Sequence, residues 1–147
     1  MPKGESGKGG SDKLQIKSAP DKHKTFDELM GVEYSGYKGQ AAIDKLMEEK
    51  QGHIKDAFYH PEIGGVDLFW GDETAGLCHI VIERKNQGLS GLKFVKTLPD
   101  VIENGRAFEG KDSDRVNIAY KGKIAVIVLE LRGTETTALL SAFHTKK

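Results

Sequence analysis

Cysteine is nearly absent from this chain, since Cys78 is the single cysteine among 147 residues. One thiol cannot form an intramolecular disulfide, and it cannot supply the several cysteines of a structural zinc site. Long apolar runs are missing too: no segment approaches the roughly 20 apolar residues of a membrane-spanning helix, and the N-terminal residues lack the apolar core of a signal peptide. We therefore expect a domain stabilised by its hydrophobic core, without membrane insertion of this chain.

An excess of charge of one sign is also missing. The chain carries 22 Lys and Arg residues against 22 Asp and Glu residues, so its formal net charge is zero. A neutral protein has no whole-molecule attraction to a nucleic acid. The charge is nonetheless unevenly divided, with a net charge of +3 over residues 1–25, −6 over residues 26–90 and +3 over residues 91–147. The neutral total therefore hides a polarised molecule.

The length suits one domain, because domains typically have roughly 100–150 residues. Residues 1–25 are rich in glycine, serine and lysine. They hold too few large apolar side chains to offset the entropy cost of ordering. We interpret this segment as a flexible linker or tail, and we expect residues 26–147 to form a single domain.

The first half of that domain has mainly helical patterns. From Gly39, apolar residues recur at spacings of three, four and seven, which predicts one helix, or two helices broken at Gly52, ending at Pro61. These apolar positions are Ile43, Leu46, Met47, Ile54, Ala57 and Phe58. A short aromatic run bounded by glycines predicts a strand over residues 66–70. Further helices are predicted over residues 77–85 and 98–104.

The second half has strand patterns. Alternating runs over residues 106–108, 116–120, 124–131 and 138–143 are separated by glycine-containing turns. This arrangement is typical of an antiparallel meander. The predicted fold class is therefore α+β, with N-terminal helices packed on a C-terminal antiparallel β-sheet.

Several blocks of sequence together resemble one known superfamily. The string GVDLFWG at Gly65–Gly71, the string GLCHI at Gly76–Ile80 and the pair Glu83–Arg84 resemble the signature of the barnase/EndoU/colicin/RelE-like (BECR) nucleases. Ala138–Phe143 is similar to a closing block usually written W-L-L-T-A-F. The similar blocks occur in order over residues 39–147. The subgroup that the chain resembles occurs in phage structural polyproteins and polymorphic toxins.

The resemblance implies a BECR-like fold and an RNA-cleaving domain, with tRNA among the candidate substrates. It implies the C-terminal toxin of a larger secreted or surface-delivered protein, such as a contact-dependent growth inhibition protein. Such a toxin acts in the cytoplasm of a target cell and is neutralised by a cognate immunity protein. The implied reaction is attack of the ribose 2′-hydroxyl on the adjacent phosphate.

The chemistry itself requires few groups. A ribonuclease without a metal must deprotonate the 2′-hydroxyl, stabilise charge on the phosphorane and protonate the leaving 5′-oxygen. Imidazole changes charge near neutral pH, so His79, early in a predicted helix, is our candidate for proton transfer. Glu83 shares its helix face and is placed to orient the ring. Arg84 lies about 140° further round, so it reaches the site only if its side chain curls back.

Each of these residues can instead have a purely structural role. His79 can instead pack beside Leu77 and Ile80 as a half-buried helix residue. Glu83 and Arg84 can instead belong to a solvated, charged helix face.

The last strand and its neighbours supply further candidates. Thr137 and Ser141 are four residues apart, which in a regular strand puts both hydroxyls on one face, where they would hold a phosphate. At the position of Ser141 the similar closing block usually has threonine. At the position of Ala138 it usually has tryptophan, so the alanine offers less stacking surface. The alternative for Thr137 is that threonine simply favours strands. The remaining substrate-binding candidates are the cationic and imidazole side chains Lys121, Lys123, Arg132 and His144.

We expect no metal ion and no other cofactor. His53 and His60 would share a helix face only if residues 52–60 were helical, and no third ligand follows at a suitable spacing. Two other functions remain open, namely a non-catalytic module of the same fold that binds nucleic acid or protein, and a different enzyme on the same scaffold. The RNA target, the cleavage of DNA and the oligomeric state stay undetermined at this point.

Overall fold

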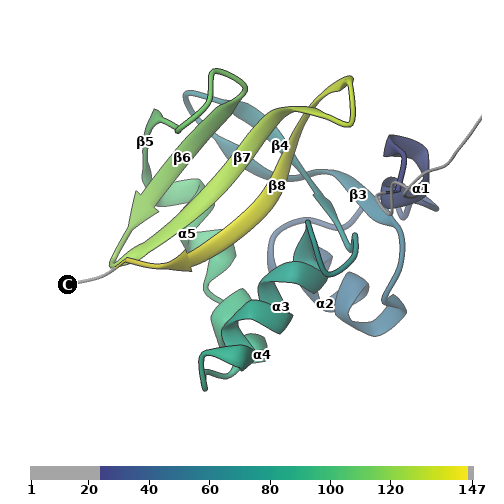
Figure 1. Cartoon of the computed structure of the whole chain (residues 1–147), viewed down its shortest axis with the longest axis horizontal. Helices are drawn as coiled ribbons and strands as arrows, with labels where there is room; N and C mark the ends of the chain where they lie inside the picture. Colours follow the sequence, from purple (N-terminus) through teal and green to yellow (C-terminus); the bar gives the residue numbers. More distant parts are fainter. Residues whose placement is uncertain (1–23, 146–147) are drawn as a thin grey trace, which may run out of the picture.

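The computed structural model describes residues 24–145, which form one α+β domain (Figure 1). The helices are α1 (Phe26–Met30), α2 (Gln40–Glu49), α3 (Leu77–Asn86), α4 (Gly91–Val95) and α5 (Leu98–Asn104). The strands are β3 (His53–His60), β4 (Gly64–Phe69), β5 (Arg106–Glu109), β6 (Arg115–Tyr120), β7 (Lys123–Leu131) and β8 (Thr134–His144). The predicted fold class is confirmed. In the described part of the chain, no helix is long and apolar enough to cross a membrane.

The predicted tail over residues 1–25 lies outside the described residues, except for Lys24 and Thr25. Thr25 caps α1: its side-chain oxygen accepts a hydrogen bond from the backbone N–H of Glu28, at 3.2 Å. The Glu28 carboxylate in turn accepts from the Thr25 backbone N–H, which completes a capping box.

The six strands form one sheet in the order β3-β4-β8-β7-β6-β5. The predicted meander is present as β5 to β8, with antiparallel pairing throughout. The hairpin β3–β4 extends it through a parallel bridge between Asp67 and Ala138. The sheet therefore includes the strand predicted over residues 66–70, as β4, and also β3, which the sequence analysis predicted as helix.

The predicted helix from Gly39 to Pro61 is wrong in its second half, since residues 53–60 form β3. Ile54 and Phe58 pair with β4 opposite Leu68 and Val66. The strand register shifts between them, and this bulge leaves Ala57 as well as Phe58 buried, so the buried positions match helical spacings of three and four. Gly52 separates the two elements at φ +85°, and a Cβ there would lie 2.5 Å from a backbone oxygen. Only glycine fits this turn without strain.

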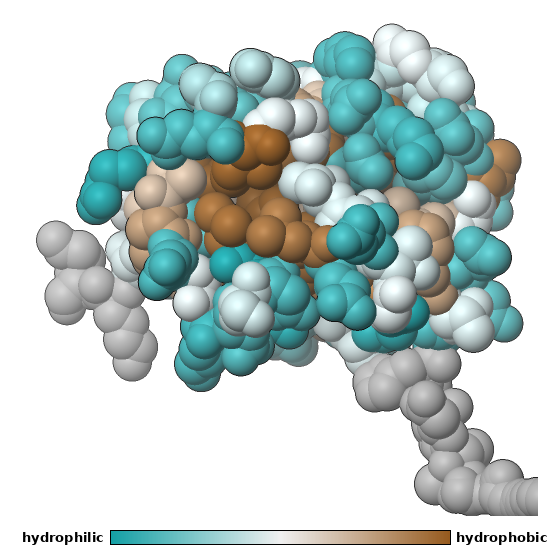
Figure 2. All heavy atoms as spheres, turned by 90° about the horizontal axis from the view of Figure 1, so that it is seen from above, coloured by the Kyte–Doolittle hydropathy of each residue, from teal (hydrophilic) through white to brown (hydrophobic). Residues whose placement is uncertain are grey.

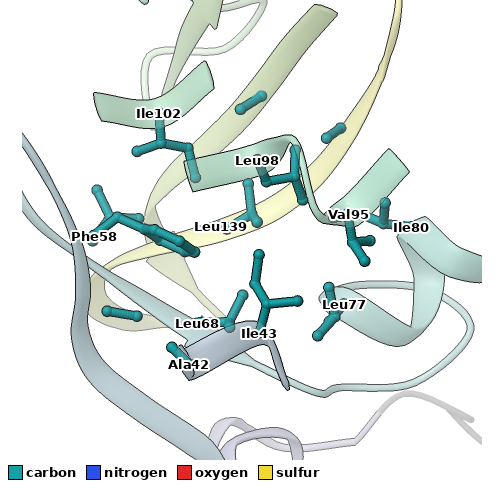
Figure 3. Packing of buried hydrophobic residues seen from close by; sticks show 14 of the residues in the cluster. Ala42, Ile43, Phe58, Leu68, Leu77, Ile80, Val95, Leu98, Ile102 and Leu139 are labelled. Carbon is teal, nitrogen blue, oxygen red and sulfur yellow. The ribbon is translucent and has the colours of Figure 1, made fainter. Parts of the chain in front are cut away.

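The main core lies between one face of the sheet and α2, α3, α4 and α5 (Figure 3). Its fully buried side chains include Ile43, Leu77, Ile80, Leu98, Ile102 and Leu139. Burying each Leu or Ile contributes roughly 1.5–3 kcal/mol relative to exposure. α3 is therefore fixed against the sheet by its Leu77 and Ile80 side.

A smaller cluster covers part of the opposite face. It joins Leu29 and Met30 of α1 to Phe69, Val128 and Ala138 of the sheet. Elsewhere on this face, the apolar side chains of β5, β7 and β8 are exposed or half-buried. Apolar residues accordingly gather in the middle of the molecular surface shown in Figure 2, with polar residues around them.

Candidate active site

Helix α3 lies along the edge of β8 beyond the bridge to β4. The backbone N–H of Gly76, just before α3, donates to the carbonyl of Leu140 at 2.9 Å. At the other end of the helix, Arg84 Nη1 donates to the carbonyl of Ala142. Gly76 has φ +93°, and a Cβ there would lie 2.8 Å from the Phe69 ring, so this close approach requires glycine. We call this contact line the α3–β8 seam.

A β-bulge in β8 lies at the seam. Val126 is opposite Ser141, whereas the next residue, Ile127, is opposite Leu139, so β8 has one extra residue here. Leu139 lies in the main core and Leu140 packs against the smaller cluster, so the two side chains lie on opposite faces of the sheet. Ser141 faces away from the main core, because the next residue, Ala142, lies in that core.

The bulge overturns the argument made for the two hydroxyls. Residues four apart share a face only in a regular strand, and the extra residue falls between Thr137 and Ser141. The spacing therefore does not place both hydroxyls on one face. A second register shift precedes Ala138. Ser141 remains beside the seam, whereas the Thr137 side chain makes no hydrogen bond to any of the residues that the structure describes.

His79 lies one helical turn after Gly76, whose backbone N–H bonds Leu140, the residue before Ser141 in β8. Its Nδ1 is 2.9 Å from the carbonyl oxygen of Glu73. A carbonyl can only accept, so Nδ1 carries the hydrogen, and Nε2 of the neutral ring is left with a lone pair. The ring is thus held in the tautomer that can accept a proton.

The helix geometry also addresses the alternative for His79. Leu77 and Ile80 are fully buried, whereas His79 is half-buried and lies about 160° round the helix from Leu77. His79 is therefore half-buried, as the alternative expected, but it lies on the side of α3 away from Leu77 and outside the core. Glu83 lies on the same helix side, but the hydrogen-bond partner of the ring in the described structure is the Glu73 carbonyl. The predicted role of Glu83 in orienting the ring is thus taken by the backbone.

Arg84 points away from His79. Its side chain is only 5% exposed, and its Nη1 reaches the β8 backbone. Its guanidinium carbon lies 5.5 Å from the centre of the Phe94 ring, and its Nε has no hydrogen-bond partner in the described structure. Burial lowers the pKa of this guanidinium. The side chain does not curl back as a catalytic role beside His79 required, and it instead fixes the end of α3 to β8.

His144 and Lys123 lie at the end of the sheet, where they are cross-strand partners. The His144 ring contacts Phe94 edge-on, with 4.9 Å between ring centres. Burial, and then the positive charges of Lys123 and Arg84, lower the pKa of His144. The two residues border a hollow of about 290 Å³, which we call the end hollow. Its lining residues are Leu89, Ser90, Lys93, Phe94, Thr97, Lys123 and His144.

The other two cationic candidates lie in turns. Lys121 is exposed between β6 and β7, with its ammonium 5.2 Å from the centre of the Tyr120 ring. Arg132 is exposed between β7 and β8, and its Nε donates to the carbonyl of Lys24 at 2.8 Å. Burial alone would raise the pKa of Asp72, but hydrogen bonds from Thr74 and the positive charges of Lys24 and Arg132 lower it overall. Arg132 thus lies near the loop before His79, and Lys121 lies at the opposite end of β7.

The uncovered part of the sheet, which we call the open face, was missed by the sequence analysis. Cross-strand partners share a face, and the strand register defines two rows across β5, β6, β7 and β8. The first row is Arg106, Ala119, Ile124 and Phe143, and the second is Phe108, Asn117, Val126 and Ser141. Phe108 and Phe143 are each 36% exposed. The rows hold two aromatic rings, one arginine and no carboxylate, which is a composition suited to stacked bases and phosphates.

Neither His53 nor His60 is arranged as a metal ligand. Both lie on β3, where His53 Nδ1 is 3.0 Å from the Met30 carbonyl and His60 Nε2 is 2.8 Å from the Gly105 carbonyl. Among residues 24–145, no three His, Cys, Asp or Glu side chains are close enough together to hold a metal ion.

Comparison with known proteins places this geometry in a family. Residues 57–147 match the family described as phage-Barnase-EndoU-ColicinE5/D-RelE like nuclease1 (PBECR1). No curated protein matches the chain. The matched segment holds α3, the whole meander and therefore the seam, the open face and the end hollow. The chain belongs to the phage Barnase-EndoU-ColicinE5/D-RelE-like nuclease family.

Proposed function

We propose that this nuclease domain cleaves RNA at the α3–β8 seam by transesterification, without a metal ion. One observation supports this most: the Glu73 carbonyl holds His79 with Nε2 free to accept a proton, on a helix fixed to the strand that carries Ser141. A nuclease of this kind needs a base at the 2′-hydroxyl and a hydrogen-bond donor at the phosphate. His79 and Ser141 are those groups in the proposal.

The reaction balances as follows. The 2′-oxygen attacks the adjacent phosphorus while its proton moves to His79 Nε2. The bond from phosphorus to the 5′-oxygen breaks, and the leaving oxygen takes a proton from solvent. The products are a 2′,3′-cyclic phosphate and a 5′-hydroxyl. The Ser141 hydroxyl donates to a non-bridging oxygen of the phosphorane, where negative charge accumulates.

The open face binds the RNA strand in this proposal. Ser141 lies in one row with Phe108, so a strand bound across the face passes the reacting groups. Exposed aromatic rings stack on unpaired bases, and Arg106 neutralises a phosphate. Bases in a duplex are already stacked on each other, so the preferred substrate is single-stranded RNA or a loop.

The experiment is incubation of the purified chain with total RNA and with a single-stranded DNA of matched length, each with and without EDTA. We expect cleavage of RNA in both conditions and no cleavage of DNA, because DNA lacks the 2′-hydroxyl. Cleavage that requires a divalent ion, or equal cleavage of DNA, would contradict transesterification.

A non-catalytic binding module is the second candidate. It is favoured by the zero net charge and by the acidic residues Asp72 and Glu73 in the loop before His79, which repel phosphates. A binding module would retain RNA in a mobility-shift assay and leave it intact after long incubation.

The biological setting is a further part of the proposal. The resemblance to polymorphic toxins supports delivery by a larger protein, action in the cytoplasm of a target cell and neutralisation by an immunity protein. Expression of residues 26–147 in a bacterial cell should then arrest growth, and co-expression of a neighbouring open reading frame from the source genome should restore it. Normal growth with RNA-cleaving protein present would contradict a toxin role.

A further inference from the structure

We propose that the end hollow is a nucleotide-binding subsite, separate from the seam, that takes one unpaired nucleotide of the RNA next to the cleaved bond. The base packs against Phe94 and Leu89, and its phosphate lies between Lys93 and Lys123. The identity of the bound chain as RNA rests on the proposed function. The binding of a nucleotide rests on the hollow itself.

The charge of the end hollow favours a phosphate. Two lysines and one histidine border it, and none of its seven lining residues is a carboxylate. Arg84 adds a buried positive charge behind the Phe94 ring, at 5.5 Å from the ring centre. A phosphate is therefore attracted by cations from α4, β7 and the end of α3 together.

The floor of the end hollow favours a base. Leu89 and Phe94 are its large apolar lining residues, and the His144 ring stands edge-on to Phe94. A flat, heteroaromatic base fits such a surface, because one of its faces covers apolar carbon while its edge forms hydrogen bonds. With its lowered pKa, His144 is mainly neutral near neutral pH, so its ring can both donate to and accept from a base edge.

The end hollow is already formed without a ligand. Ser90 caps α4 by accepting from the Lys93 backbone N–H at 3.2 Å. The Thr97 hydroxyl donates to the Phe94 carbonyl at 2.7 Å. Arg84 holds the end of β8 through the Ala142 carbonyl. These contacts fix the walls before binding, so little conformational entropy is lost when a nucleotide enters.

The position of the end hollow separates it from the reacting phosphate. His144 follows Ser141 by three residues, which is roughly 10 Å along a strand, and this odd spacing puts the two side chains on opposite faces of the sheet. In the proposal the RNA passes round the end of β8, so the nucleotide binds beside, and not at, the cleaved bond. A base enters such a hollow only when it is unpaired, so the subsite selects for single-stranded RNA.

The test uses the full chain with His79→Ala, which prevents cleavage during titration. Uridine 5′-monophosphate, uridine and inorganic phosphate are titrated separately, and binding is followed by ¹H–¹⁵N NMR. We expect the monophosphate to shift amides around Leu89–Thr97 and His144, and to bind at least about tenfold more tightly than uridine or phosphate alone. Absence of shifts at these residues, or equal binding of all three probes, would overturn the proposal.

A matched pair of variants separates the subsite from non-specific charge. Lys93→Ala removes a cation that lines the hollow, whereas Lys96→Ala removes an equally exposed cation of α4's C-terminal end that does not line it. Lys93→Ala should weaken monophosphate binding about tenfold, and Lys96→Ala should leave it unchanged. Equal effects of the two variants would contradict the subsite.

These readouts keep the two proposals apart. If Lys93→Ala weakens monophosphate binding and the unsubstituted protein never cleaves RNA, the subsite is supported and the proposed function is contradicted. If Lys93→Ala leaves binding unchanged and the protein cleaves RNA only with His79 intact, the proposed function is supported and the subsite is contradicted.

Discussion

The two ends of α3 lie beside the two histidines of the candidate site, and the charges around those histidines differ in sign. At the start of α3, His79 follows the loop with Asp72 and Glu73, and its Nδ1 bonds a backbone carbonyl. At the far end, burial lowers the pKa of His144, and the nearby positive charges of Lys123 and Arg84 lower it further. The same side chain therefore lies beside acidic residues at one end of α3 and beside cations at the other, and in our proposal only the first takes part in proton transfer.

The largest expected effect is at the start of α3. His79→Ala should reduce RNA cleavage by a factor of about 10² to 10⁴, which is the usual contribution of a general acid or base. The melting temperature should change little, because His79 is outside the core. Cleavage rate and thermal unfolding are measured together, with Asn86→Ala at the exposed end of the same helix as control. A folded, fully active His79→Ala protein would show that the reaction does not take place at the start of α3.

Ser141 tests whether the reaction extends onto the bulged strand. Ser141→Ala should slow cleavage about tenfold to a hundredfold, since a hydrogen bond to a charged group contributes roughly 1.5–3 kcal/mol. Ser141→Thr keeps the hydroxyl and should retain most of the activity. The steady-state cleavage rates of both variants and of the unsubstituted protein are measured on a short single-stranded RNA. Equal activity of the alanine and serine proteins would remove Ser141 from the mechanism.

Arg84 tests the structural half of the comparison. Arg84→Met should lower the free energy of unfolding by about 1–3 kcal/mol, because the buried Ala142 carbonyl loses its hydrogen-bond donor. Chemical denaturation measures this loss. A protein with unchanged stability and abolished cleavage would instead show that Arg84 acts on the substrate.

The smallest expected effect is the pH dependence from His144. Its pKa is lower in the folded protein than the ordinary value of 6.5, so below that value the unfolded chain binds more protons than the folded one. Stability must then fall as the pH falls through this window. The melting temperature of His144→Gln should therefore decline less between pH 7 and pH 5 than that of the unsubstituted protein. Parallel curves for both proteins would contradict the lowered pKa of His144.

Local patterns predicted much of this fold. The strand at residues 66–70, the helices from Leu77 and Leu98 and the four-stranded meander follow from short-range periodicity and glycine turns. Residues 53–60 were misassigned because the bulge in β3 buries Ile54, Ala57 and Phe58, whose spacings of three and four are those of a helix although the segment is a strand. Pairing with β4 decides between the two, and pairing is not written in the local sequence.

The candidate site was predictable only in part. His79 and Ser141 were named from chemistry and from a resemblance, and they lie on α3 and β8, the two elements that the seam joins. The partner of Arg84 is a backbone carbonyl 58 residues away, which no spacing rule could find. The bulge at Leu140 and the rows of the open face depend on strand register. The end hollow depends on the meeting of α4, β7 and β8.

The most direct test of the central claim is the chemistry of the RNA ends. A 5′-labelled, single-stranded RNA is cleaved in the presence of EDTA, and the products are examined by mass spectrometry. Transesterification by the 2′-hydroxyl predicts fragments with a 2′,3′-cyclic phosphate and a 5′-hydroxyl, absent when an RNA with 2′-O-methyl groups is used. Fragments with a 5′-phosphate, or cleavage of the methylated RNA, would contradict the account.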